Sequence, residues 1–293
     1  GRLESNKQIK INFNGGDLSS DAGLLLIKEF ACKIGLVKLV KKLFHTNDSA
    51  VFRRHTDADN LMQMIYQIIA AYFEDDCSDE LTNDPVLTAV LEKEALASQP
   101  TLSRFFNRMD EDTISQFDAI DSKMREIVYS IKHPEHMLFD LDSTLLNTYG
   151  RQEGEGFNYH YQAHGYHPLL CFDGLTGDLL KVELRDGTQY CSKESDLFMI
   201  PLMQEYRTKY PSLPLYLRGD SGFASPALYE ACEENDCKYA IRLKDNATLR
   251  KLAADEDEAL SRATKDNQVD YAVEYGEFLY HDQIGRASCR ERV

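Results

Sequence analysis

Two apolar runs that each lead into an aspartate constrain this chain more than any other feature. Residues 137–141 run into Asp142, and residues 213–217 are followed closely by Asp220. Short apolar runs of this kind are typical of buried strands, and an acid placed after a strand lies at the edge of its sheet. Carboxylate oxygens are the ligands that hard divalent cations prefer. The pattern therefore predicts a sheet whose edge carries two acids suited to a metal.

The order of expected elements after residue 136 indicates a mixed α/β sheet. Strands are expected at 137–141, 166–172, 179–184, 213–217 and 239–243, and helices at 193–210 and 226–235. A short turn at 173–178 joins the second strand to the third, so these two must be antiparallel neighbours. The order is three strands, a helix, a strand, a helix and a last strand.

The first part of the chain is expected to be helical. Apolar residues recur every three or four positions over 21–44, which predicts one amphipathic helix or a broken pair. Further helices are expected at 58–73, 84–96, 101–108 and 112–131. The helix at 101–108 carries Arg104, a candidate DNA contact. A bundle that merely supports the next domain fits the same pattern.

Charge and composition limit the partners and the compartment. The net charge of -16 argues against indiscriminate binding to nucleic acid, because Lys and Arg supply most of that affinity. Residues 1–56 nevertheless hold ten Lys or Arg and five acids, so a polyanion would meet this part first, although a solvated helix face explains the same charges. The scattered cysteines, the polar N-terminus and the lack of a membrane-spanning run predict a cytoplasmic chain with reduced thiols.

The acidic motifs and the order of elements resemble a known family. The motifs are Leu141-Asp142-Ser143-Thr144 and Arg218-Gly219-Asp220-Ser221-Gly222-Phe223, with further similar text at 12–16, 21–24, 100–104 and 241–246. They resemble the DDE transposases of insertion sequences, in particular the insertion-sequence-1380 group. The resemblance implies an α/β fold of the ribonuclease H-like type, with a mixed five-stranded sheet flanked by helices after an all-α N-terminal region. In that fold the first and fourth strands lie side by side.

The same resemblance implies metal-dependent cleavage of the element's ends and strand transfer into target DNA. Asp142 and Asp220 would be the catalytic acids and would hold two Mg²⁺ (or Mn²⁺) ions about 4 Å apart. One ion would activate water or a 3′-hydroxyl, and the other would stabilise the leaving oxygen. Arg218, Arg242 and Lys244 would hold DNA phosphates, or would pair with nearby acids instead. The implied partner is terminal-repeat and target DNA, bound by a homodimer at the bacterial nucleoid.

Four segments are expected on this basis. Residues 1–132 would be a helical region for DNA binding or dimerisation, and 133–254 the catalytic core. Residues 255–283 would begin a β-rich insertion, with a strand over 268–281, and 284–293 would be a non-native tail.

A third acid is expected in this family, as a glutamate on a late helix. Glu274 and Glu277 fall in the strand pattern and come too early. We therefore expect a truncated product with an incomplete catalytic triad. It should show negligible cleavage with Mg²⁺ or Mn²⁺, and robust Asp142-dependent cleavage of terminal-repeat DNA would contradict this expectation.

Alternative functions remain open at this point. Asp140 and Asp142 also fit the Asp-x-Asp-x-Thr loop of haloacid dehalogenase-like phosphatases, with Asp140 as nucleophile and Asp142 as general acid. A non-catalytic fragment that binds terminal repeats is a further alternative. A serine-protease interpretation of 219–222 lacks a histidine motif before it.

A zinc site is the last alternative. His160, His164 and His167 have spacings that suit zinc on a helix. Gly165 and Pro168 would break such a helix, so an extended, aromatic-rich loop is expected there.

Overall fold

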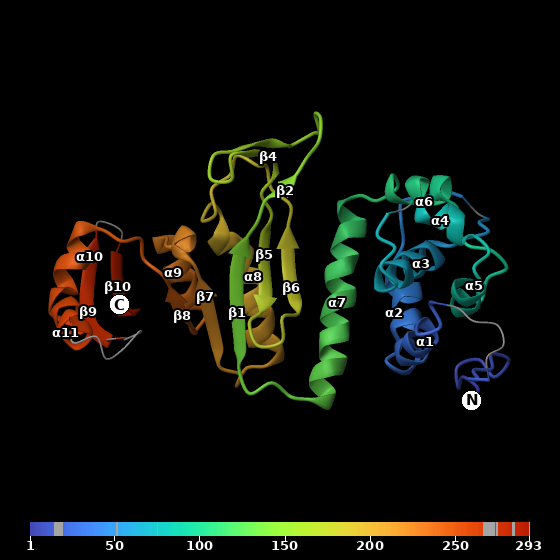
Figure 1. Ribbon diagram of the computed structural model, residues 1–293, viewed down its shortest axis with the longest axis horizontal. Helices are drawn as coiled ribbons and strands as arrows, with labels where there is room; N and C mark the ends of the chain where they lie inside the picture. The colour runs from blue at the N-terminus through green and yellow to red at the C-terminus, as the bar shows by residue number, and fades with distance from the viewer. Residues whose placement is uncertain are drawn as a thin grey trace. The chain divides into compact units, whose positions relative to one another are not determined.

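The computed structural model describes the chain except residues 15–19, 51, 75, 266–272, 274, 283–284 and 293. The chain forms two compact units, Gly1–His133 and Pro134–Val293. Their elements are shown in Figure 1, and each unit is described by itself. In the described part of the chain, no helix is both long and apolar enough to cross a membrane.

The N-terminal unit is helical, as the sequence predicts. Its helices are α1 (Leu24–Lys33), α2 (Leu36–Leu43), α3 (Asp57–Ile69), α4 (Cys77–Leu81), α5 (Pro85–Leu91), α6 (Gln99–Phe106) and α7 (Glu111–Ile131). The stretch 21–44 is a broken pair because Gly35 has a left-handed φ of 77° between α1 and α2. The helix expected at 84–96 is shorter, since Glu92 leaves the helical conformation with a φ of 56°.

A cluster of buried apolar side chains holds these helices together. Val40, Phe44, Leu87 and Phe105 are almost fully enclosed within it. The rings of Phe44 and Phe105 lie 5.9 Å apart, in a tilted arrangement that favours aromatic contact. This unit therefore has a hydrophobic core of its own.

The second unit is built on a five-stranded sheet. Its strands are β1 (Met137–Ser143), β5 (Leu169–Asp173), β6 (Leu179–Glu183), β7 (Leu215–Gly219) and β8 (Cys237–Ile241). Across the sheet they follow the order β6-β5-β1-β7-β8. β5 is antiparallel to both β1 and β6, whereas β1, β7 and β8 are parallel. The expected mixed sheet, with its first and fourth strands adjacent, is confirmed.

One expected strand is in fact two. The sequence predicts a single strand over 166–172, but β4 (Ala163–Tyr166) ends before Pro168 and β5 begins after it. Proline lacks the N–H that a continuous ladder needs. β4 instead lies between β2 (Leu146–Asn147) and β3 (Gly156–Asn158) in a small antiparallel sheet. This small sheet lies beyond the carboxyl end of β1 (Figure 1), where the sequence predicted only an extended loop.

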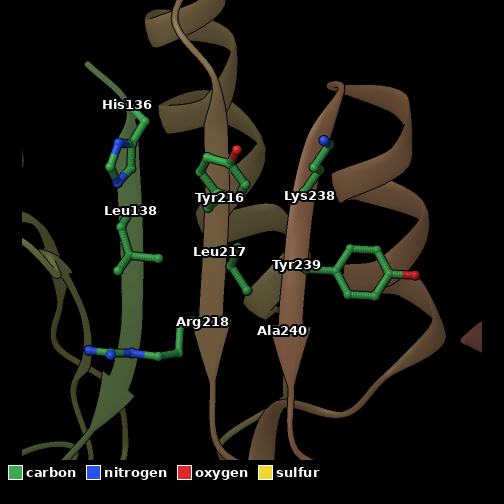
Figure 2. A pocket seen from close by; sticks show the side chains of 8 residues that line it. All are labelled: His136, Leu138, Tyr216, Leu217, Arg218, Lys238, Tyr239 and Ala240. Atoms are coloured by element: carbon green, nitrogen blue, oxygen red, sulfur yellow. The ribbon is translucent and has the colours of Figure 1, made fainter. Parts of the chain in front are cut away.

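Helices cover one face of the large sheet. They are α8 (Ser195–Lys209) and α9 (Pro226–Glu234), close to their predicted bounds. The Tyr206 ring of α8 meets Phe139 of β1 edge-on at 5.3 Å. On the other face, Leu138, Tyr216 and Ala240 contribute to a hollow of about 470 Å³ (Figure 2). Alternation along β1 thus separates a buried face from an open one.

The chain after β8 is partly helical, where a β-rich segment is expected from residue 255. α10 (Ala247–Leu252) is followed by α11 (Ala254–Lys265). The first turn of α11 carries three acids, and negative charge at a helix N-terminus favours the helix. The strand expected at 268–281 begins after α11, and the assignment of 255–283 to a β-rich insertion stays a prediction.

A two-stranded antiparallel sheet closes the described chain. It pairs β9 (Tyr275–Asp282) with β10 (Gly285–Arg292). Most of the first half of the strand expected at 268–281 lies outside the described residues. The segment 284–293 showed no apolar period in the sequence, and its non-native origin stays a prediction.

Candidate active site

Parallel pairing of β1 with β7 brings the two predicted acids to one edge of the sheet. Leu141 of β1 lies opposite Gly219, the last residue of β7, so Asp142 and Asp220 are the next residues along the two segments at this edge. Neighbouring strands are about 4.8 Å apart. Both aspartates are exposed. We call the carboxyl ends of β1, β7 and β8 the rim.

Each rim carboxylate is oriented by a nearby backbone N–H. Ser143 N donates to Asp142 Oδ1 at 2.8 Å, and Gly222 N donates to Asp220 Oδ1 at 2.8 Å. Asp220 thereby caps the short 3₁₀ helix η1 (Ser221–Phe223). Neither carboxylate forms an ion pair with another residue that the structure describes. The rim therefore presents two anionic groups that are held in place but not neutralised.

Asp140, two residues before Asp142, is in a different electrostatic state. Arg218 Nε donates to Asp140 Oδ1 at 2.9 Å, and Arg218 Nη2 donates to Oδ2. The hydrogen bonds to Asp140 raise the pKa of Arg218. Figure 2 shows the Arg218 side chain reaching from β7 across to β1. Of the two roles expected for Arg218, the structure thus shows pairing with a neighbouring acid.

This geometry argues against the phosphatase alternative. A haloacid dehalogenase-like nucleophile at Asp140 would be clamped by Arg218 from the adjacent strand. In addition, β1 lies between an antiparallel and a parallel neighbour. That arrangement does not suit the all-parallel core of such enzymes.

The loop at residues 184–194, between β6 and α8, reaches the rim, and we call it the rim loop. Cys191 Sγ accepts a hydrogen bond from Ser143 Oγ at 3.3 Å. The same sulfur would lie 3.3 Å from a Cβ added at Gly222. The rim loop therefore touches Ser143, the residue after Asp142, and Gly222, which lies two residues after Asp220.

Tyr161, between β3 and β4, approaches the rim from the small sheet. Its hydroxyl donates to the carbonyl oxygen of Ser143 at 3.3 Å. Burial raises the pKa of Tyr161, and the nearby Cys191, Asp142 and Asp220 raise it further. Tyr161 therefore lies near both aspartates.

The predicted cationic residues after β8 lie near the rim. Arg242 N donates to Gly219 O at 3.3 Å, so the backbone there still runs alongside β7. Lys244 Nζ donates to Tyr190 Oη at 2.6 Å and lies 5.2 Å from that ring's centroid. This hydrogen bond raises the pKa of Lys244. Arg104 belongs to the N-terminal unit, where its guanidinium donates to Thr101 at 3.3 Å.

The three histidines considered for zinc have separate partners. His164 pairs with Glu155 at 2.9 Å, and His160 packs edge-on against Tyr161. His167 is buried and its Nδ1 donates to the Gln189 carbonyl at 2.8 Å. Among the residues that the structure describes, no group of three or more His, Cys, Asp or Glu side chains is placed to hold a metal.

Arg185 supports the rim loop from inside the fold. It is buried, and its guanidinium donates to the carbonyls of His167, Cys191 and Lys193 at 3.2, 3.4 and 2.9 Å. Burial lowers the pKa of Arg185. Neither Arg185, Tyr190 nor Cys191 was a candidate from sequence, because loop residues carry no periodic signal that places them beside a sheet edge. The sequence predicted an aromatic-rich loop around Tyr161, but it did not indicate that this loop lies beside the rim.

Comparison with known proteins adds three findings. A family model described as "Transposase DDE domain group 1" matches residues 2–290. A comparison with curated proteins gave no match. Similar solved structures include the catalytic core domain of BIV integrase, with 12% identity over 47% of this chain and 76% of that chain and a TM-score of 0.24. The catalytic domain of Mos1 mariner transposase is 12% identical over 56% of this chain and 76% of that chain, with a TM-score of 0.28.

Proposed function

The chain belongs to the family of transposases with a DDE domain, group 1, and from this premise we propose that its rim binds divalent metal and supplies two of the three acids that the family uses to cleave DNA phosphodiesters. Asp142 and Asp220 are the proposed metal ligands and catalytic acids. The observation that supports the proposal is the pairing of Leu141 with Gly219, the residues that directly precede Asp142 and Asp220.

The donor set fits a hard divalent cation. Both side chains supply carboxylate oxygens, which Mg²⁺ and Mn²⁺ prefer over nitrogen or sulfur. Their exposure leaves room for a phosphate to approach. The contrast with Asp140, whose charge Arg218 already balances, distinguishes the pair from the other acid on β1.

The chain's own groups have definite tasks in this proposal. A bound divalent cation would supply an activated nucleophile and stabilise charge on the phosphate oxygens. The backbone N–H groups of Ser143 and Gly222 fix the orientation of the two carboxylates. Lys244 and Arg242, both exposed beside the rim, attract the phosphates that flank the cleaved bond.

The experiment that tests this function is the dependence of Mn²⁺ binding on Asp142 and Asp220. Metal binding is a suitable measure because it does not require the third acid of the family. Loss of Mn²⁺ binding in either Asp→Asn variant is the expected result, and unchanged binding in both would overturn the proposal.

The proposed partner is DNA, namely the terminal repeats of an insertion sequence and its target. We propose that two copies of the chain act together on the paired ends, on chromosomal DNA in the bacterial cytoplasm. Sedimentation of the chain with and without DNA tests the copy number, and a monomer in both conditions would contradict it.

The salt dependence of DNA binding should report the two cationic residues. We expect Arg242→Ala and Lys244→Ala each to reduce the slope of log affinity against log salt by about 1, because each removes one phosphate contact. Fluorescence anisotropy with a labelled DNA duplex, repeated over a series of salt concentrations, measures this slope.

Lys209→Ala is the matched control. Its ammonium already pairs with Glu205 at 2.8 Å on α8, so its removal should leave the slope unchanged. Equal slopes in the wild type and both rim variants would show that Arg242 and Lys244 do not contact phosphate.

A further inference from the structure

The side chain of Tyr190 stands beside the rim with its ring half in solvent. Tyr190 is 53% exposed although it lies in the middle of the rim loop. Its hydroxyl accepts the hydrogen bond from Lys244, whose ammonium lies 5.2 Å from the ring centroid at the hydroxyl end of the ring. An accessible aromatic face and a cation thus occur together at one point of the surface.

The backbone around Tyr190 is fixed on both sides. The preceding carbonyl, of Gln189, accepts from the buried His167. The following residue, Cys191, is held through its sulfur by Ser143 and through its carbonyl by Arg185. A ring that is already held in position loses little conformational freedom when a ligand stacks on it. Tyr190 is therefore preorganised for contact rather than loosely exposed.

The position of this ring relates it to the aspartate pair. Cys191, the next residue, touches Ser143 and approaches Gly222, which closely follow Asp142 and Asp220. Lys244 is also close enough to Asp220 for that carboxylate to contribute to its raised pKa. A nucleotide at Tyr190 would therefore neighbour the phosphate at the rim.

From this juxtaposition we propose that Tyr190 and Lys244 form a subsite for one unpaired nucleotide next to the cleaved bond. The base stacks on the Tyr190 ring, and Lys244 binds the adjoining phosphate. The subsite deepens the proposed function, on which it rests for the identity of the ligand as DNA.

The nucleotide must be unpaired for a physical reason. Inside a duplex both faces of a base are covered by its neighbours, so a protein ring gains access only to a base that is frayed, flipped or single-stranded. Stacking on an aromatic side chain contributes about 1–3 kcal/mol per base and does not depend strongly on sequence. The subsite thus favours DNA ends that open, whatever base is exposed.

The test compares two DNA probes that carry the same number of phosphates. Both are labelled duplexes with a single-stranded tail; one tail is oligothymidylate, and the other is abasic and of equal length. We expect the wild type to bind the thymidine-tailed probe at least about five-fold more tightly, which is the lower end of one stacking contact. Tyr190→Ala should remove most of this preference without changing the salt slope.

Tyr190→Phe separates stacking from support of Lys244. It keeps the ring but loses the hydroxyl that accepts from Lys244, so the preference for the thymidine tail should persist. If Tyr190→Phe loses the preference as fully as Tyr190→Ala does, the tyrosine acts only by holding Lys244 and the stacking subsite is wrong. An unchanged preference in Tyr190→Ala would also overturn it.

These measurements need neither metal nor cleavage. A wild-type preference that Tyr190→Ala removes would therefore stand even if Asp142 and Asp220 proved not to bind Mn²⁺. Conversely, Mn²⁺ binding without any tail preference would refute the subsite and leave the proposed function intact.

Discussion

Asp142→Asn and Asp220→Asn should each weaken the tightest Mn²⁺ binding of this chain by at least about ten-fold, since even indirect partners of metal ligands change affinity by that much. The substitution keeps the shape of the side chain and replaces a carboxylate by a neutral amide, which is a poorer ligand for a hard cation. Titration followed by electron paramagnetic resonance of free Mn²⁺ measures the affinity.

Asp178→Asn controls for the acidic surface of a chain with net charge -16. Asp178 is an exposed carboxylate in the turn between β5 and β6, and the register of β5 with β1 puts this turn at the opposite end of β1 from the rim. Its loss should leave the tightest site unaffected. Equal weakening in Asp178→Asn and the two rim variants would mean that Mn²⁺ binds the surface in general.

Gly187→Ala should destabilise the second unit by about 3 kcal/mol, at the upper end of the cost of overpacking. A Cβ at Gly187 would lie 2.1 Å from the carbonyl oxygen of Gly165 and 2.5 Å from that of Gly156. Both are backbone atoms of the small sheet and have little freedom to move. The added methyl group must therefore push the rim loop away from β3 and β4.

Amide hydrogen exchange resolves this effect by segment. Peptides covering 156–166 and 184–194 should exchange faster in Gly187→Ala than in the wild type, and the urea midpoint of the second unit should fall. Gly23→Ala is the matched control, because no atom lies within 4 Å of its added Cβ and its φ is -58°. Wild-type exchange in both peptides would contradict the close approach at Gly187.

The Arg218–Asp140 pair shows that residue type alone does not predict whether a cationic side chain near the acidic motifs is available to bind DNA. Arg218 and Lys244 are both cationic residues close to an acidic motif, and the sequence treats them alike. In the sheet, Arg218 lies opposite Asp140 in the register and binds it with two hydrogen bonds. Lys244 instead meets a tyrosine hydroxyl from the rim loop. Only the strand register distinguishes the two roles.

Local pattern was sufficient for the large elements of the second unit. Each of these elements has a pattern that is local to its own residues: apolar runs at 137–141 and 213–217, and helical periods at 193–210 and 226–235. A local pattern predicts an element correctly because it shows which side of that segment is buried. The short turn at 173–178 likewise implied antiparallel strands. The order of elements then suggested a family in which the first and fourth strands are adjacent, as the structure confirms.

The amino-acid sequence by itself thus determined the strands of the large sheet, their order along the chain and the two acids near the ends of β1 and β7. Only the tertiary structure decided what surrounds those acids: Cys191 against Ser143, Tyr161 against the Ser143 carbonyl, Arg185 bound to the backbone of the rim loop, and Tyr190 beside Lys244. Most of these contacts join residues that are distant along the chain, and each involves a loop residue without a period. Their partners are set by how the two sheets and the rim loop pack, which no short stretch of sequence encodes.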